Sequence, residues 1–196
     1  MAAALCSLKG PKHGGANIKV QQMMKDLKKH VKDTSDVDEI VFYLNQLLNK
    51  EAFDKKGLIY GMGHAVYTLS DPRAVILKRK AFEMAKGKEI EAEFQLLSLI
   101  EELTPILMKE VRGVDKAMCA NVDMYSGLVY AMLGIPEEVF TPLFASARIA
   151  GWCANRIEEV VTCHRIMRPA YRAVTTHEAY IPMDQRGEHL HLSAAD

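Results

Sequence analysis

Apolar residues recur every three or four positions along much of this chain, which is the spacing of one face of an α-helix. The clearest stripe covers residues 37–48 and carries Val37, Ile40, Val41, Leu44, Leu47 and Leu48. Asp36 and Glu39 at its start resemble a capping box, in which each side chain bonds the other residue's backbone N–H. A second stripe carries Ile90, Phe94, Leu97, Ile100 and Leu103, and Pro105 is expected to kink or end that helix.

The same spacing, with glycine and proline as boundaries, predicts the remaining helices. They cover residues 16–30, 72–86, 122–133 and 137–160, after a short helix-like run at 2–8. Residues 162–182 look irregular or short-stranded, and residues 183–196 are polar and expected to be loose. No series of alternating apolar and polar residues predicts a sheet, so the predicted fold class is all-α.

Composition narrows the classes of function. The chain has 196 residues, of which 49% are hydrophobic, and 25 basic side chains balance 25 acidic ones. A neutral chain has no overall basic field for nucleic acid or anionic lipid, and no apolar run has the length of a membrane span. The beginning lacks a basic leader, so no signal peptide is expected. The four cysteines show no paired spacing, which favours free thiols and a cytoplasmic protein. They are Cys6, Cys119, Cys153 and Cys163.

Three loops of unusual composition, at 10–17, 57–71 and 113–121, are where the chemistry is expected. The first contains His13 between glycines, which let the backbone approach a ligand closely. The amides of the following helix would keep this imidazole neutral, and a neutral imidazole can donate a hydrogen bond to a carbonyl oxygen. The alternative is an ordinary histidine in a surface loop.

The second loop contains Gly61-x-Gly63-His64, a weak phosphate-binding signal. The third glycine of a dinucleotide fingerprint is missing, so a Rossmann fold is rejected, and the alternative role for His64 is a satisfied histidine in a tight turn. Asp123 follows the third loop at the head of an apolar helix. It is interpreted either as a helix N-cap or as a general base at a loop-to-helix junction.

Three arginines are candidates for binding carboxylates: Arg73, Arg148 and Arg168. Arg148 lies within an otherwise apolar helix, on a face expected to contact protein. Its guanidinium needs a carboxylate, either Glu158 or Glu159 in a structural ion pair or an anionic ligand. The pair His189-x-His191 could touch a metal, but it has no further ligands nearby and no metal site is predicted.

Taken together, these segments resemble the citrate synthase family. The resemblance runs from residue 1 to about 182 and rests on five elements in the family's order. One is Gly-x-Gly-His-x-Val-Tyr followed by Asp-Pro-Arg; the five cover residues 7–17, 61–74, 121–136, 144–152 and 168–169. The resemblance implies an all-α fold in four parts. Residues 1–15 would end a large-domain segment, 16–140 form the small CoA-binding domain, 141–182 return to the large domain, and 183–196 form a loose tail.

The resemblance also implies an acyltransferase reaction, the condensation of acetyl-CoA with oxaloacetate that opens the tricarboxylic acid cycle. Asp123 would remove the α-proton, His13 would hydrogen-bond the thioester oxygen, and His64 would protonate the ketone oxygen of oxaloacetate. Arg73, Arg148 and Arg168 would bind its carboxylates, the last across a homodimer. The implied CoA-binding residues are Leu58, Ile59, Gly61, Gly63, Lys116 and Asn121. The acyl-CoA is a cosubstrate, and no tightly bound cofactor, nucleic acid or membrane is expected.

Some positions depart from the family. Its members are much longer and contain an upstream half that is absent here, so either a homodimer or a complementing N-terminal half is expected. The family often has histidine where Asn155 stands, and an aromatic–proline pair where Cys119-Ala120 stands. Two alternatives stay open. One is a 2-methylcitrate synthase that uses propionyl-CoA, and the other is a non-catalytic fragment that binds CoA or a partner.

Overall fold

The computed structural model describes residues 2–8, 15–163 and 182. Within them the chain forms helices and no strand, which confirms the predicted all-α class. The helices are α1 (Ala2–Leu8), α2 (Ala16–His30), α3 (Val37–Leu48), α4 (Pro72–Ala85), α5 (Glu91–Arg112), α6 (Asp123–Met132), a 3₁₀ turn (Glu137–Val139) and α7 (Phe140–Thr162). Nearly all of the segment predicted as irregular, and all of the predicted tail, lie outside the described residues.

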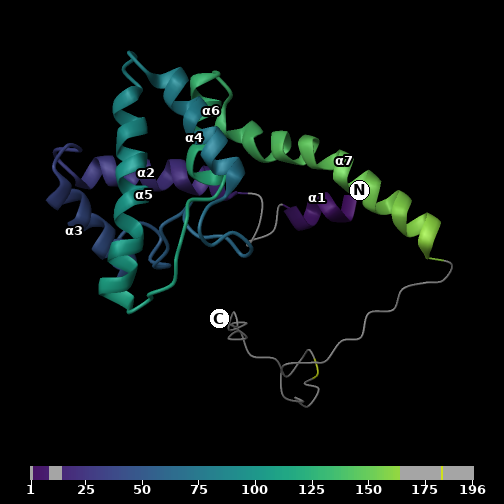
Figure 1. The fold of residues 1–196 in the computed structure, drawn as a ribbon, viewed down its shortest axis with the longest axis horizontal. Helices are drawn as coiled ribbons and strands as arrows, with labels where there is room; N and C mark the ends of the chain where they lie inside the picture. The colour runs from purple at the N-terminus through teal and green to yellow at the C-terminus, as the bar shows by residue number, and fades with distance from the viewer. Residues whose placement is uncertain (1, 9–14, 164–181, 183–196) are drawn as a thin grey trace. The chain divides into compact units, whose positions relative to one another are not determined.

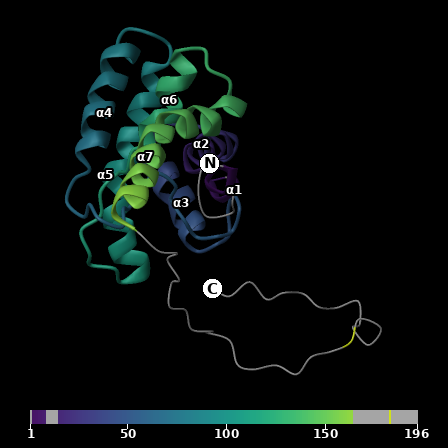
Figure 2. The same ribbon diagram turned by 90° about the vertical axis from the view of Figure 1, so that its right-hand side faces the viewer.

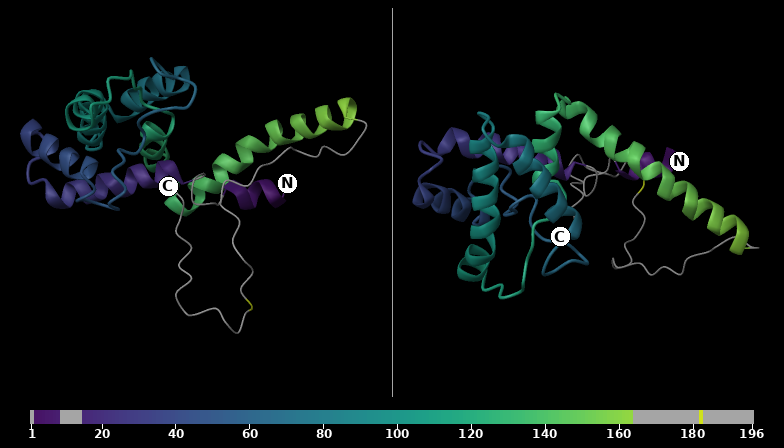
Figure 3. Two further views of the ribbon diagram at one scale, coloured as in Figure 1. Left: turned by 90° about the horizontal axis from the view of Figure 1, so that it is seen from below. Right: turned by 45° about the horizontal axis from the view of Figure 1, so that its top comes forward.

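Helices α2 to α6 pack into a bundle (Figures 1 and 2). Helix α6 lies against α2, α4 and α5, and α3 lies against α2 and α5. Two further views of these helices are given in Figure 3. Each large apolar side chain that is fully buried contributes about 1.5–3 kcal/mol. The core includes Met23, Met24, Leu27, Ile40, Tyr43, Leu44, Leu47, Leu97, Ile100, Met124 and Tyr125.

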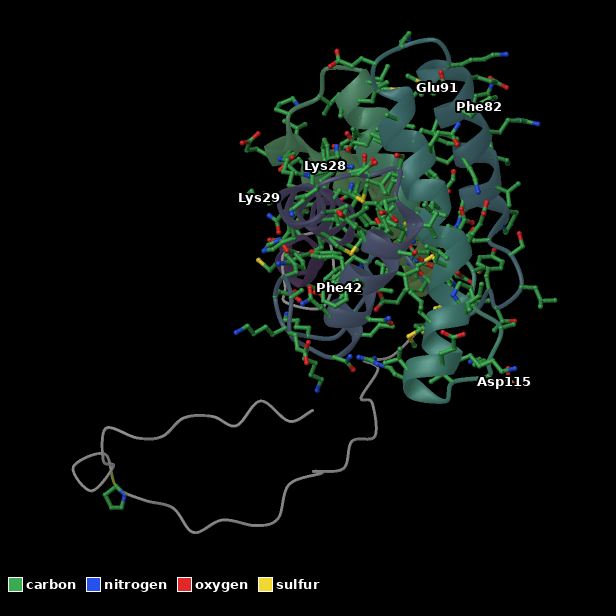
Figure 4. All side chains as sticks on the ribbon, turned by 90° about the vertical axis from the view of Figure 1, so that its left-hand side faces the viewer. Lys28, Lys29, Phe42, Phe82, Glu91 and Asp115 are labelled. Atoms are coloured by element: carbon green, nitrogen blue, oxygen red, sulfur yellow. The ribbon has the colours of Figure 1, made fainter. Side chains whose placement is uncertain are left out.

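Lys28 and Lys29 at the end of α2 are exposed, as their polarity predicts, but several large apolar residues are exposed as well (Figure 4). Asp115 follows the last turn of α5 and is exposed. Phe42, in contrast, projects from α3 with 65% of its surface exposed, although it is a large aromatic residue. It falls outside the predicted apolar stripe of that helix, and single exposed apolar residues are common on protein surfaces.

The capping box predicted for α3 is half correct. Asp36 is the N-cap, and its carboxylate accepts hydrogen bonds from the backbone N–H groups of Asp38 and Glu39. Glu39 does not bond back to the backbone of Asp36. Its Oε2 instead accepts from the N–H groups of Lys32 (2.7 Å) and Asp33 (3.2 Å). Through these two bonds, Glu39 connects the turn that precedes the helix to the first turn of α3.

Pro105 does not end its helix. Helix α5 continues through it to Arg112, so that part of the prediction is wrong. A proline inside a helix removes one backbone hydrogen bond. Apolar residues on both sides of it, such as Ile100 and Leu107, are buried in the core and hold the two halves of the helix in place. The Thr104 hydroxyl also donates to the Ile100 carbonyl oxygen at 2.6 Å.

The chain divides into two units, residues 1–155 and 156–196. The domain boundaries expected from the family resemblance stay predictions. The face of α7 that was expected to contact protein is largely exposed in the structure. The buried residues of this helix are Phe140 and Ala145. No helix in the described ranges is long and apolar enough to cross a membrane.

Candidate active site

The second and third predicted loops meet beside the start of α6. The Gly63 N–H donates to the Cys119 carbonyl oxygen (2.8 Å), and the Asn121 N–H donates to the Gly61 carbonyl oxygen (2.9 Å). The Asn121 side chain adds a third bond from Nδ2 to the Gly63 carbonyl oxygen (2.8 Å). These bonds bring together Gly61, Gly63 and Asn121, three of the residues predicted to bind CoA.

Gly61 lets this loop approach α6 closely. Its φ is +88°, and a Cβ there would lie 2.9 Å from the Met124 Cα and 2.7 Å from its Sδ. Gly63 also has a positive φ of +83°, but a Cβ at Gly63 would meet nothing within 4 Å. A left-handed backbone favours glycine at both positions, and the close contact requires it at Gly61.

The other residues predicted to bind CoA are less closely grouped. Leu58 is 49% exposed and available to a ligand. Ile59 is buried in the hydrophobic core, which leaves its backbone rather than its side chain for such a role. Lys116 is exposed in the third loop, and within the described part of the chain no hydrogen bond or ion pair of its side chain ties it to the paired loops.

The protonation of His64 follows from its hydrogen bonds. Its Nδ1 faces the backbone N–H groups of Val66 (3.0 Å) and Tyr67 (3.1 Å), which are donors. Nδ1 must therefore accept, so the neutral imidazole carries its proton on Nε2. The interpretation of His64 as a satisfied histidine in a tight turn is therefore correct for Nδ1. The other side presents a donor N–H next to Arg73.

Asp71 fixes the position of Arg73. Two bonds join them, from Nε to Oδ1 (3.0 Å) and from Nη2 to Oδ2 (2.8 Å). Asp71 is 1% exposed and also caps α4 by accepting from the Arg73 N–H. The guanidinium lowers the pKa of the Asp71 carboxyl, and Asp71 in turn raises the pKa of Arg73. This grip places Nη2 3.2 Å from Nε2 of His64.

Asp123 is not the N-cap of its helix, so that interpretation is wrong. It is the first residue of α6, and its backbone N–H donates to Oδ1 of Asn121 (2.9 Å), which supplies the turn before the helix. Burial raises the pKa of the Asp123 carboxyl, and the positive charge of Arg73 partly opposes that rise. A carboxylate with a raised pKa is a stronger base, which suits proton abstraction.

The remaining predicted site residues are His13, Arg148 and Arg168. His13 and Arg168 lie outside the described residues. Arg148 is exposed on α7, with its Cζ 5.5 Å from the centre of the Phe144 ring. No ion pair with Glu158 or Glu159 forms among the described residues, and Glu159 pairs with Arg156 instead (2.6 Å). The predicted structural ion pair is therefore wrong, and the anionic ligand stays a prediction for Arg148.

Two residues of this cluster were missed by the sequence analysis. Asp71 was placed only at the end of the second loop and in the Asp-Pro-Arg motif, although an Asp two positions before an Arg at a helix start could have indicated the pairing. Tyr67 contacts both His64 and Arg73, and no periodic or charge signal indicated it. A surface pocket of about 460 Å³ adjoins Asp71 and Cys119 but is not lined by His64 or Asp123.

The cluster can be described chemically. It contains a half-buried carboxylate of raised pKa, an imidazole with a donor N–H, and a guanidinium anchored by a buried aspartate. No group of three or more His, Cys, Asp or Glu residues that could hold a metal ion gathers in the part of the chain that the structure describes. An anionic substrate with a carbonyl or carboxylate oxygen fits these donors.

Comparison with known proteins identifies the family. The domain family described as citrate synthase, C-terminal domain, matches residues 1–170. The chain belongs to the citrate synthase family. All of the predicted catalytic and carboxylate-binding residues, including His13 and Arg168, fall within the matched range.

Relatives in the citrate synthase family agree with this assignment. The citrate synthase of Synechocystis is 36% identical over 188 residues, which cover 95% of this chain and 43% of that protein. The citrate synthase of Deinococcus radiodurans is 39% identical over 169 residues, or 86% of this chain and 40% of that protein. The chain therefore spans less than half the length of these relatives.

Solved citrate synthase structures share the fold. The Thermotoga maritima enzyme superposes with a TM-score of 0.66 at 35% identity, covering 92% of this chain and 45% of that one. The Thermoplasma acidophilum enzyme was solved in a ternary complex with carboxymethyl coenzyme A and oxaloacetate. It superposes with a TM-score of 0.67 at 30% identity, covering 94% of this chain and 45% of that one.

Proposed function

We propose that this chain carries the catalytic groups of a citrate synthase, which condenses acetyl-CoA with oxaloacetate to give citrate and CoA. One observation carries the proposal. Nε2 of His64 and Nη2 of Arg73 are both donors and lie 3.2 Å apart, and Arg73 is near enough to the half-buried carboxylate of Asp123 to influence its pKa. Two adjacent donors suit a substrate that presents carbonyl and carboxylate oxygens together, as a 2-oxo acid does.

The proposed reaction needs one base and two hydrogen-bond donors. Asp123 removes a proton from the methyl group of acetyl-CoA, while His13 donates to the thioester oxygen and an enol forms. The enol carbon attacks the ketone carbon of oxaloacetate, and His64 transfers its Nε2 proton to the ketone oxygen. Water then cleaves the thioester of citryl-CoA, which releases citrate and the free thiol of CoA. Each positioned acid or base typically contributes about 10²–10⁴ in rate.

Substrate binding is assigned by chemistry. Arg73 binds a carboxylate of oxaloacetate, with Arg148 and Arg168 as the further proposed partners, because a guanidinium forms two parallel bonds to a carboxylate. The paired loops with Leu58, Gly61 and Asn121 are proposed to contact CoA. The ternary complex of the Thermoplasma acidophilum relative supports this pair of ligands.

We further propose that the active form brings this region together with further protein, either a second copy, as in a homodimer, or residues equivalent to the upstream half of the relatives. The relatives are more than twice as long as the matched region. Helix α7 exposes Ile149, Ile157 and Val160, and a stretch of exposed apolar residues is typical of an interface.

A thiol-release assay tests the proposed activity. The chain is mixed with acetyl-CoA and oxaloacetate, with and without the upstream half of the Deinococcus radiodurans citrate synthase, and free CoA thiol is followed. Release should fall by about 10²–10⁴ in Asp123→Asn, because the base is lost while the shape is kept. Asp115→Asn is the matched control, since Asp115 is exposed in the adjoining loop and pairs with Lys109.

The same assay decides between the alternatives. Faster release with propionyl-CoA than with acetyl-CoA would indicate a 2-methylcitrate synthase. Binding of CoA by calorimetry without release in either mixture would indicate the non-catalytic fragment. Equal release by the parent chain and by Asp123→Asn would contradict the proposed role of Asp123.

A further inference from the structure

The contact between His64 and Arg73 raises a physical question. Nε2 of His64 carries a proton because Nδ1 accepts from two backbone N–H groups. Arg73 Nη2 carries only donor hydrogens, yet it lies 3.2 Å from that nitrogen. Two donors that face each other do not bond. Other contacts must therefore hold the imidazole of His64 and the guanidinium of Arg73 in these positions.

Asp71 explains the position of Arg73 but not that of His64. The guanidinium is gripped by two bonds to a buried carboxylate. Among the described residues the imidazole accepts hydrogen bonds only at Nδ1, and such bonds leave the ring free to tilt about that nitrogen. A second restraint on the face of the ring is needed to keep Nε2 in place.

Tyr67 supplies that restraint and contacts both groups. Its ring centre lies 5.0 Å from the centre of the His64 ring, with the planes at 37°. The Cζ of Arg73 lies 5.6 Å from the same ring centre, within cation–π range. The backbone N–H of Tyr67 also donates to Nδ1 of His64 (3.1 Å). One residue therefore touches the imidazole at its face and at its edge.

The third loop holds Tyr67 in turn. Sγ of Cys119 donates to the Tyr67 carbonyl oxygen at 3.4 Å. The backbone oxygen of Cys119 accepts from the N–H of Gly63, the residue before His64. Cys119 thus contacts the His64 segment both before and after the histidine, with its backbone on one side and its side chain on the other.

We propose that Tyr67 is a positioning residue, whose ring packs against His64 and Arg73 so that their Nε2 and Nη2 donors converge on one substrate oxygen. The proposal rests on the proposed function for the identity of that oxygen. The packing itself is a property of this chain. Removing the aromatic face should release His64 more than Arg73, because Asp71 still holds the guanidinium.

Nitrogen NMR of the imidazole tests this role without turnover. In chain labelled with ¹⁵N-histidine, the His64 signals are assigned by their loss in His64→Gln. A ring fixed with its proton on Nε2 gives well-separated Nδ1 and Nε2 resonances, whereas a ring that exchanges tautomers gives averaged ones. Tyr67→Leu should narrow the separation about twofold, and Tyr67→Phe should keep the parent spectrum, because it retains the aromatic face.

The outcomes are distinct. A parent-like spectrum in Tyr67→Leu would overturn the proposal, and so would equal narrowing in Tyr67→Leu and Tyr67→Phe. Circular dichroism checks that each variant folds, and Tyr67→Met replaces Tyr67→Leu if the latter does not. Because the spectra need no substrate, a chain that releases no CoA still tests Tyr67. A parent-like spectrum in Tyr67→Leu would likewise leave the thiol-release result unchanged.

Discussion

Helices α5 and α7 have almost the same length, 22 and 23 residues, and both carry apolar side chains along a face. They differ in what covers that face. Helix α5 buries Phe94, Leu97 and Ile100 against its neighbours, whereas α7 leaves Ile149, Ile157 and Val160 exposed. An apolar stripe therefore indicates which side of a helix favours burial. It does not indicate whether a neighbour is there to bury it.

The largest expected effect separates the two helices by stability. Leu97→Ala in α5 should lower the free energy of unfolding by about 2–5 kcal/mol, because it leaves a cavity in the core. Ile157→Ala in α7 removes a side chain that is 63% exposed and should change it by less than about 0.5 kcal/mol. Urea unfolding of both variants measures the difference. Similar losses would show that α7 is buried in solution.

A second pair of variants moves the comparison to the loops of the candidate site. Gly61→Ala forces a Cβ into a left-handed backbone and against Met124, whereas Gly63→Ala meets only the backbone strain. Strain of this kind costs on the order of 1–3 kcal/mol, and Gly61→Ala should lose more because of the clash. Thermal unfolding of the two variants compares them. A larger loss in Gly63→Ala would contradict the close approach to α6.

A third comparison uses two carboxylates with pKa shifts of opposite sign. The lowered pKa of Asp71 contributes stability above its ordinary value of 3.8, and this is lost as the pH falls through the lowered value. The raised pKa of Asp123 does the reverse, since stability falls as the pH rises from 3.8 through the raised value. At neutral pH, Asp71→Ala should be destabilised by about 0.5–2 kcal/mol through loss of the cap, and Asp123→Asn should be stabilised.

Urea unfolding between about pH 2 and pH 7 measures these two opposite effects, the Asp71 effect below pH 3.8 and the Asp123 effect above it. The Arg73 side chain is about half exposed, so solvent screening keeps the contribution of its pair with Asp71 small. A destabilised Asp123→Asn variant would contradict the inference that the ionised carboxylate is held there at a cost in stability.

The smallest expected effect concerns Cys119. A thiol-to-carbonyl bond contributes about 0.5–1 kcal/mol, so Cys119→Ala should speed hydrogen exchange of the Tyr67 amide about two- to fivefold. Cys119→Ser keeps a donor and should show a smaller change. Amide exchange followed by NMR gives both values, and identical rates in the two variants would assign the effect to packing rather than to the hydrogen bond.

Particular residues show how far the sequence predicts this protein. The stripe on α3 gave the helix its bounds, because amphipathic spacing and the Asp36 cap are local features. Pro105 does not end its helix, as one part of the prediction expected, because burial of α5 on both sides outweighs one lost backbone bond. The N-cap interpretation of Asp123 was wrong because Asp123 is itself the first residue of α6, and its backbone N–H donates to Oδ1 of Asn121.

The sequence by itself determined the helices, the all-α class and, through the resemblance of several ordered motifs, the family and the identity of His64, Arg73 and Asp123 as candidates. Only the tertiary structure decided how these residues meet. The Nε2 proton of His64, the grip of Asp71 on Arg73 and the packing of Tyr67 against both His64 and Arg73 depend on contacts within a folded loop and between separate loops. Helical periodicity records which residues share a face, but the directions of hydrogen-bond donors are set only when the chain has folded.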